Sequence, residues 1–217
     1  MKASFIAVVA GLLFSSIAAA GPTAQDAELL ITNSANQINA IVKDAPAYID
    51  TDPDRYYEQI AEALDPVVDF TTFARGVMGH LASKRYVESL PEGERDAART
   101  AVPQFRDVLY HTVVKSYGKI FYNYAGSQFS IQSSELLGNG DQASVIQKVV
   151  DTQAKQYALQ YTLNNKGGKG WKIQNVIVDG VNMGQSYRAQ FEAALERYKG
   201  NTSDVIKNWP EIMEGHE

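Results

Sequence analysis

The spacing of apolar residues divides the chain into a helical first half, a strand-rich middle and a helical end. Apolar positions recur at helical spacing in several stretches between residues 22 and 125. The strongest pattern covers residues 105–124, where apolar side chains fall at i, i+3, i+4 and i+7 steps. It predicts a long helix that ends at Gly126. The helical period returns at residues 181–199 and in a short stretch at 202–208.

Capping and breaking residues set the expected helix limits in the first half. The expected helices cover residues 24–42, 52–65, 67–78 and 80–87, with a further one opening near residue 91. Asp52 followed by Pro53 is a good start, because Asp caps a helix and Pro fits its first turn. Pro103 is expected to kink or split its helix, because a proline within a helix removes a hydrogen bond.

From about residue 128 the apolar period changes to two. The clearest strand is 156–163, where Tyr and Leu alternate with polar or small residues. The runs 127–137, 143–152 and 170–179 are also rich in β-formers, and short turn-like segments connect all four. Short connections favour antiparallel neighbours, so we expect a four-stranded meander. Separate blocks of helices and strands predict an α+β fold.

The N-terminus has the three parts of a secretory signal peptide. Lys2 is positive, residues 5–14 are apolar, and the small residues 18–20 form an A-x-A-like cleavage site. The apolar run is too short to span a bilayer, which takes about 20 residues. We therefore expect residues 1–20 to be removed and residues 21–217 to form a single domain outside the cytoplasm.

The charge and cysteine content of the chain limit the kinds of partner and anchor that we expect. The formal net charge of −5 argues against a nucleic-acid partner and against a polybasic membrane-surface binder. The chain has no cysteine, so it has no disulfide and no lipoprotein anchor, and packing alone must hold the fold.

Few residues in the sequence have the type and spacing of a catalytic or metal site. The three histidines, His80, His111 and His216, have no metal-binding spacing, and we expect no metal and no cofactor. The run 167–170 (GGKG) lacks the phosphate-loop pattern and is read as a hairpin turn. Asp69 has two interpretations: a general base in a pocket, or a capping or salt-bridged carboxylate.

Aromatic residues are abundant, with 12 Tyr and 8 Phe. They can fill a packed core, or they can line an apolar cavity between the long helix and the sheet. Patterning alone leaves both interpretations open.

Three ordered segments resemble one family. Asp69-Phe70 with residues 75–79 (RGVMG), the block 106–131 and the segment 170–195 are similar to the MlaC, or toluene-tolerance (Ttg2-type), family of periplasmic phospholipid-binding proteins. The last segment is the most specific, and the matching residues in it are Trp171, Gly180, Val181, Tyr187, Arg188 and Phe191. The resemblance covers about residues 25–210. The chain departs from the family pattern at three places: Asn182 replaces Ser, Asn175 replaces Asp, and residues 80–82 (HLA) lack the aromatics often found there.

The resemblance implies a periplasmic carrier without enzymatic activity. It implies helices wrapped around a twisted, mainly antiparallel sheet that encloses an apolar cavity for phospholipid acyl chains. The implied partners are an inner-membrane ABC-transporter complex and an outer-membrane lipoprotein–porin complex, between which phospholipid moves to maintain outer-membrane lipid asymmetry.

Sixteen residues are expected to contact the ligand, on two walls and a rim. They are Phe70, Phe73, Val77, Val113, Tyr117, Ile120, Tyr124, Val145, Val149, Tyr157, Leu159, Tyr161, Ile173, Val181, Met183 and Tyr187. Two alternatives stay open: an isomerase-like enzyme with a hydrophobic pocket and Asp69 as base, and a structural or adaptor protein whose apolar residues are all core.

Overall fold

The computed structural model describes residues 21–215, and the expected signal peptide lies outside the described residues. The α-helices of this part are α1 (Ala24–Asp44), α2 (Pro53–Leu64), α3 (Phe70–Met78), α4 (Lys84–Ser89), α5 (Glu92–Asn123), α6 (Met183–Arg197), α7 (Thr202–Lys207) and α8 (Trp209–Glu214). Two short 3-10 turns, η1 (Ala45–Ala47) and η2 (Gly79–Ala82), follow α1 and α3.

The strands lie side by side in chain order and every neighbouring pair is antiparallel. They are β1 (Gln128–Leu137), β2 (Gln142–Val150), β3 (Gln156–Asn164), β4 (Lys172–Val178) and β5 (Val181–Asn182). The α+β class and the antiparallel meander are confirmed, with one difference. The sheet has a fifth strand of two residues, which pairs with the end of β4 before α6 begins.

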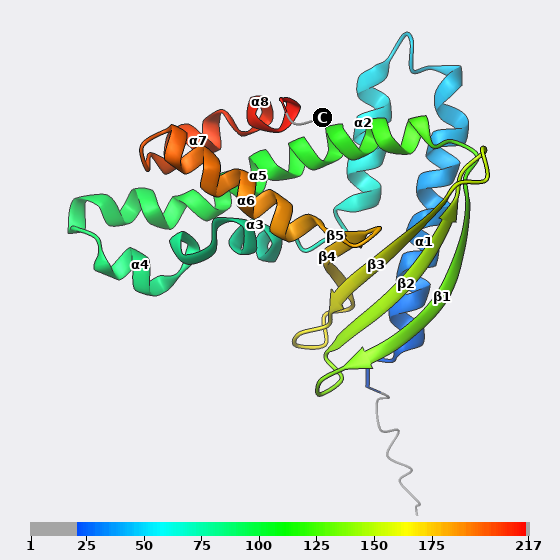
Figure 1. The fold of residues 1–217 in the computed structure, drawn as a ribbon, viewed down its shortest axis with the longest axis horizontal. Coiled ribbons are helices and arrows are strands. Elements are labelled where there is room, and N and C mark those ends of the chain that lie inside the picture. Colours follow the sequence, from blue (N-terminus) through cyan, green and yellow to red (C-terminus); the bar gives the residue numbers. More distant parts are fainter. Residues whose placement is uncertain (1–20, 216–217) are drawn as a thin grey trace, which may run out of the picture.

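The helices lie on one side of a curved sheet (Figure 1). The first helix, α1, runs along the sheet and packs on β1 and β2. The long α5 packs against α2 and α3, and α7 and α8 cover its other side. Within residues 21–215, no helix has both the length and the apolar character needed to cross a bilayer.

Three helix predictions need correction. The expected helix 80–87 is divided at Ser83 into η2 and α4. Helix α3 begins at Phe70 and not at residue 67, because Val68 forms an extended bridge to Ile173 of β4. The Ile173 N–H donates to the Val67 carbonyl (2.7 Å), which removes that carbonyl from any helix. The long helix also continues through Pro103 without a break. We attribute this to packing, since Ala101, Val102 and Phe105 around the proline are all buried.

Two of the departures from the family pattern, Asn175 and Asn182, are hydrogen-bonded to each other. The Asn175 side-chain amide donates to the Asn182 side-chain oxygen (3.0 Å), and the Asn182 oxygen caps α6 by accepting from the Gln185 N–H. Asn175 in turn accepts from the Gly184 N–H (2.9 Å). A Cβ at Gly184 would lie 2.8 Å from the Asn175 oxygen, so a larger residue there would displace the Asn175 side chain.

The apolar interior forms two packed clusters. The helical core joins α2, α3, α5 and the C-terminal helices around the fully buried Phe105, Phe191 and Trp209. The sheet core joins Ala27 and Ile31 of α1 to Ala143 and Val145 of β2, together with neighbouring residues of β3 and β4. The space between these clusters holds the candidate site.

Tyr56 anchors α2 to α5 inside the helical core. Its hydroxyl donates to the Gly118 carbonyl (2.8 Å) and its side chain is fully buried. Replacing Tyr56 by Phe should lower the free energy of unfolding by about 1 kcal/mol, the usual contribution of one buried hydrogen bond. Urea unfolding measures the change. Tyr57→Phe is the matched control, since no hydrogen bond of its hydroxyl is formed within residues 21–215. Equal stability of wild type and Tyr56→Phe would contradict the assignment.

Candidate functional site

An apolar cavity of about 450 Å³ lies between the helices and the concave face of the sheet. Its walls come from α1, the end of α2, α3, α5, the start of α6 and strands β1 to β4. The volume falls within the range of small-molecule binding pockets, roughly 300–1,000 Å³. The lining is largely aliphatic and aromatic. The interior is therefore hollow at this place, between the two packed clusters.

Thirteen of the sixteen predicted ligand contacts lie together on the cavity wall. They are Phe70, Phe73, Val113, Tyr117, Ile120, Tyr124, Val149, Tyr157, Leu159, Tyr161, Ile173, Met183 and Tyr187. Among them are three residues of α5 at helical spacing and three alternate residues of β3, as the sequence pattern predicted. Whether these side chains contact a ligand stays a prediction.

Val77, Val145 and Val181 do not line the cavity. Val77 is buried within the helical core on α3. Val145 lies on the correct face of β2, but α1 residues Ala27 and Ile31 pack over that end of the sheet. Val181 is 56% exposed, because the short strand β5 holds it at the sheet edge.

The sequence prediction missed the contribution of α1. Six residues of this helix line the cavity: Ile31, Ser34, Ala35, Ile38, Asn39 and Val42. Their helical spacing is visible in the sequence, but such a stripe is equally typical of packed core. Its role depends on where α1 crosses the sheet. Further lining residues that were missed are Leu64, Val67, Val68, Phe121, Ser127, Phe129, Gln147, Gln174, Asn175, Val176 and Val178.

The cavity opens near the end of α5. Among its lining residues, only Ile120 and Tyr124 are exposed, at 45% and 42%. Tyr124 meets Tyr157 of β3 edge to face, with ring centroids 5.5 Å apart. The Tyr157 hydroxyl lies 3.1 Å from an Asp151 carboxylate oxygen, and the Lys155 ammonium lies 4.8 Å from the centre of its ring. Both charges therefore stand beside the opening, and the wall behind them is apolar.

Two hydrogen-bonded pairs of polar side chains lie on the wall of the cavity. The Tyr161 hydroxyl donates to the Gln147 side-chain oxygen (2.9 Å), and Tyr117 is hydrogen-bonded to the Tyr187 side chain. Burial raises the pKa of Tyr117 to about 12. Burial also raises the pKa of Tyr161, with a further increase from nearby Tyr117. Both tyrosines are thus neutral at physiological pH, and the cavity wall carries polarity without charge.

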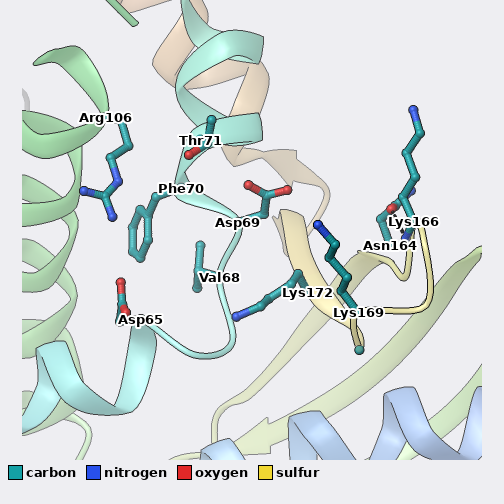
Figure 2. A pocket seen from close by; sticks show the side chains of 11 residues that line it. Asp65, Val68, Asp69, Phe70, Thr71, Arg106, Asn164, Lys166, Lys169 and Lys172 are labelled. Carbon is teal, nitrogen blue, oxygen red and sulfur yellow. Dashed lines mark hydrogen bonds between the residues drawn. The ribbon is translucent and has the colours of Figure 1, made fainter. Parts of the chain in front are cut away.

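A second hollow of about 320 Å³ lies on the other side of Val68 and Phe70, which line both spaces. It holds charged side chains of both signs: Asp65, Asp69, Arg106, Lys166, Lys169 and Lys172 (Figure 2). The Lys172 ammonium donates to the Pro66 carbonyl, so this lysine ties β4 to the segment before α3. The hollow is of mixed charge, and Val68 and Phe70 line both it and the apolar cavity.

Asp69 is the N-cap of α3. Its carboxylate accepts from the Thr72 N–H (2.9 Å) and from the Thr72 hydroxyl (2.6 Å). The carboxylate points to the side of the hollow where Lys169 extends (Figure 2). Asp69 does not line the apolar cavity. The capping interpretation of this residue is therefore confirmed.

Known proteins are similar to this chain in sequence and in fold. The toluene tolerance protein ttg2D of Pseudomonas putida is 29% identical over 159 residues, which cover 73% of this chain and 68% of that protein. A phospholipid-binding protein from Ralstonia solanacearum, solved in complex with a phospholipid, superposes with a TM-score of 0.69 at 16% identity. That match covers 86% of this chain and 96% of the other, and it shows a shared fold.

The sequence model of the MlaC protein family matches residues 32–211, which include every wall of the cavity except the first residue of the α1 stripe. This agrees with the resemblance found in the three ordered sequence segments. Because the match spans far more than half of the chain, the protein belongs to the MlaC family.

Proposed function

We propose that the protein is a periplasmic carrier that binds the acyl chains of phospholipid in the apolar cavity. The single observation that carries the proposal is that this cavity is hollow, apolar and open at one end. Family membership supports it, as does the phospholipid bound to the structural neighbour. The thirteen predicted contacts on the cavity wall are the proposed ligand contacts.

The energetics explain why a carrier is needed. Each buried methylene contributes about 0.8 kcal/mol, so one chain of roughly 16 carbons gains on the order of 12 kcal/mol by leaving water. A free phospholipid therefore rarely leaves a bilayer to cross an aqueous gap. A protein that encloses the chains removes most of that barrier. The head group stays hydrated at the opening, beside Ile120 and Tyr124.

Family membership supports a wider role. We propose export by the signal peptide at residues 1–20 and a single phospholipid-binding domain over 21–217. The carrier exchanges phospholipid with an inner-membrane ABC-transporter complex and an outer-membrane lipoprotein–porin complex, and so supports outer-membrane lipid asymmetry. No nucleic acid is involved.

A transfer assay tests the carrier function. Donor vesicles containing a labelled phospholipid are separated from unlabelled acceptor vesicles by a membrane that passes the protein and retains vesicles. The mature protein should speed transfer in proportion to its concentration. If transfer with the protein, at every concentration tested, is no faster than transfer in buffer alone, the proposal is contradicted.

The isomerase-like alternative loses its proposed base. Asp69 is occupied as a helix cap and lies outside the cavity. Asp69→Asn should keep both stability and phospholipid uptake, because Asn caps a helix about as well as Asp. Asp69→Ala should lose about 1 kcal/mol of unfolding free energy and still take up phospholipid. Urea unfolding and lipid extraction measure the two properties. A folded Asp69→Asn protein that takes up no lipid would show that Asp69 belongs to the binding site.

A further inference from the structure

Gln147 places a polar group with unused hydrogen-bonding capacity on the wall of the apolar cavity. Gln147 lies on β2, its side chain lines the cavity, and the residue is only 3% exposed. It faces the same side of the sheet as Val149, two residues further along the strand. Its neighbour across the sheet is Leu159, another residue of the cavity wall.

The protein satisfies only one end of this side chain. The Gln147 side-chain oxygen accepts from the Tyr161 hydroxyl (2.9 Å). Within residues 21–215, the two N–H bonds of its Nε2 atom find no acceptor. This atom is open to the cavity and is not fully enclosed by protein. A ligand that fills the cavity would enclose it, and an enclosed donor without an acceptor costs free energy. The amide therefore points to a ligand that brings an acceptor into the cavity.

The depth of Gln147 indicates which acceptor this is. Val149 pairs with Tyr157, and Tyr157 contacts Tyr124 at the opening. Gln147 lies one same-face position further in, about 7 Å along the strand. In a phospholipid whose chains fill the cavity and whose head group stays outside, the ester carbonyls lie at this boundary. Deeper parts of the acyl chains have no acceptor to offer.

We infer that Gln147 is a specificity-determining residue whose amide N–H donates to an acyl ester carbonyl of the bound lipid. The inference rests on the proposed function and adds a chemical preference to it. An ether-linked lipid has the same head group and chains but lacks both carbonyls. The protein should therefore select ester-linked over ether-linked phospholipid.

A competition experiment measures this selection. The mature protein is incubated with vesicles containing equal amounts of a diacyl phosphatidylglycerol and its dialkyl ether analogue of equal chain length. It is then separated from the vesicles, and the two extracted lipids are quantified by mass spectrometry. Wild type should carry about fivefold more ester than ether lipid, the ratio expected for one hydrogen bond. Gln147→Leu should carry the two in a ratio of about one, as expected when that bond is lost.

Two further measurements separate this role from a structural one. Gln174→Leu is the matched control, because Gln174 also lines the cavity and undergoes the same chemical change. It should keep the ester preference. With a lipid labelled by ¹³C at its ester carbonyls, the infrared carbonyl band should shift to lower frequency in wild type and in Gln174→Leu. The shift should be absent in Gln147→Leu.

The outcomes distinguish the inference from the proposed function. If wild type carries neither lipid, the proposed function fails and the inference falls with it. If wild type carries both lipids equally, the carrier function stands and the inference is overturned, which is the result expected if water satisfies the amide. An ester preference that persists in Gln147→Leu, or disappears in Gln174→Leu instead, also overturns it.

Discussion

Replacing Leu159 by Arg is expected to reduce phospholipid loading by roughly 100-fold while the chain stays folded. Leu159 lies in the middle of β3 and faces the cavity, between Tyr157 near the opening and Tyr161 further in. A guanidinium buried among acyl chains loses its hydration without gaining a partner. An arginine that extends to the opening to stay hydrated would lie along the path of the chains. Both arrangements disfavour the bound lipid.

Lipid extraction from equal amounts of purified protein measures this loss. Gln160→Arg is the matched control, because Gln160 is the next residue of β3 and is exposed on the opposite face of the sheet. It should load lipid like wild type. Circular dichroism verifies the fold of both variants. Normal loading of a folded Leu159→Arg protein would show that the lipid binds elsewhere.

The second large effect concerns stability. Phe105→Ala should lower the free energy of unfolding by about 3–5 kcal/mol. Phe105 is fully buried, and its ring lies 4.9 Å from that of Phe191 and 5.1 Å from that of Trp209. Three elements, α5, α6 and α8, meet at these rings, so the space left by the lost side chain cannot close easily. The substitution removes both apolar contact and packing between these helices.

Urea unfolding of Phe105→Ala and of Phe129→Ala gives the comparison. Phe129 of β1 lines the cavity and is only partly buried, so its loss enlarges a space that is already open. We expect a cost of about 1 kcal/mol for Phe129→Ala. Similar costs at the two positions would mean that the cavity wall is packed as tightly as the helical core.

Local periodicity predicted most of the fold. The runs 127–137 and 156–163 match β1 and β3 closely, because a period of two combined with turn residues is a local signal. The errors lie where contacts between residues far apart in the sequence determine the local structure. Val68 is extended because Ile173, more than 100 residues later, bonds that segment, and α5 survives Pro103 because other helices pack around it.

The sequence predicted the parts of the candidate site that lie on a periodic apolar face of a helix or strand. Alternate residues of β3 and the apolar face of α5 did line the cavity. The alternation of side chains along β2 placed Val145 on the cavity-facing side, but it could not show that α1 packs over that end of the sheet. The α1 stripe itself was missed for the same reason, since its spacing is compatible with core and with cavity. Gln147 gave no signal, because one polar residue in a strand is ordinary.

We expect phospholipid to occupy the cavity in the native protein. Native mass spectrometry can detect it in the mature protein, purified from cells without detergent. The main species should be heavier than the polypeptide by the mass of phospholipid, which denaturation releases and lipid extraction identifies. A spectrum with the bare polypeptide alone under gentle conditions, unchanged after incubation with phospholipid vesicles, would contradict it.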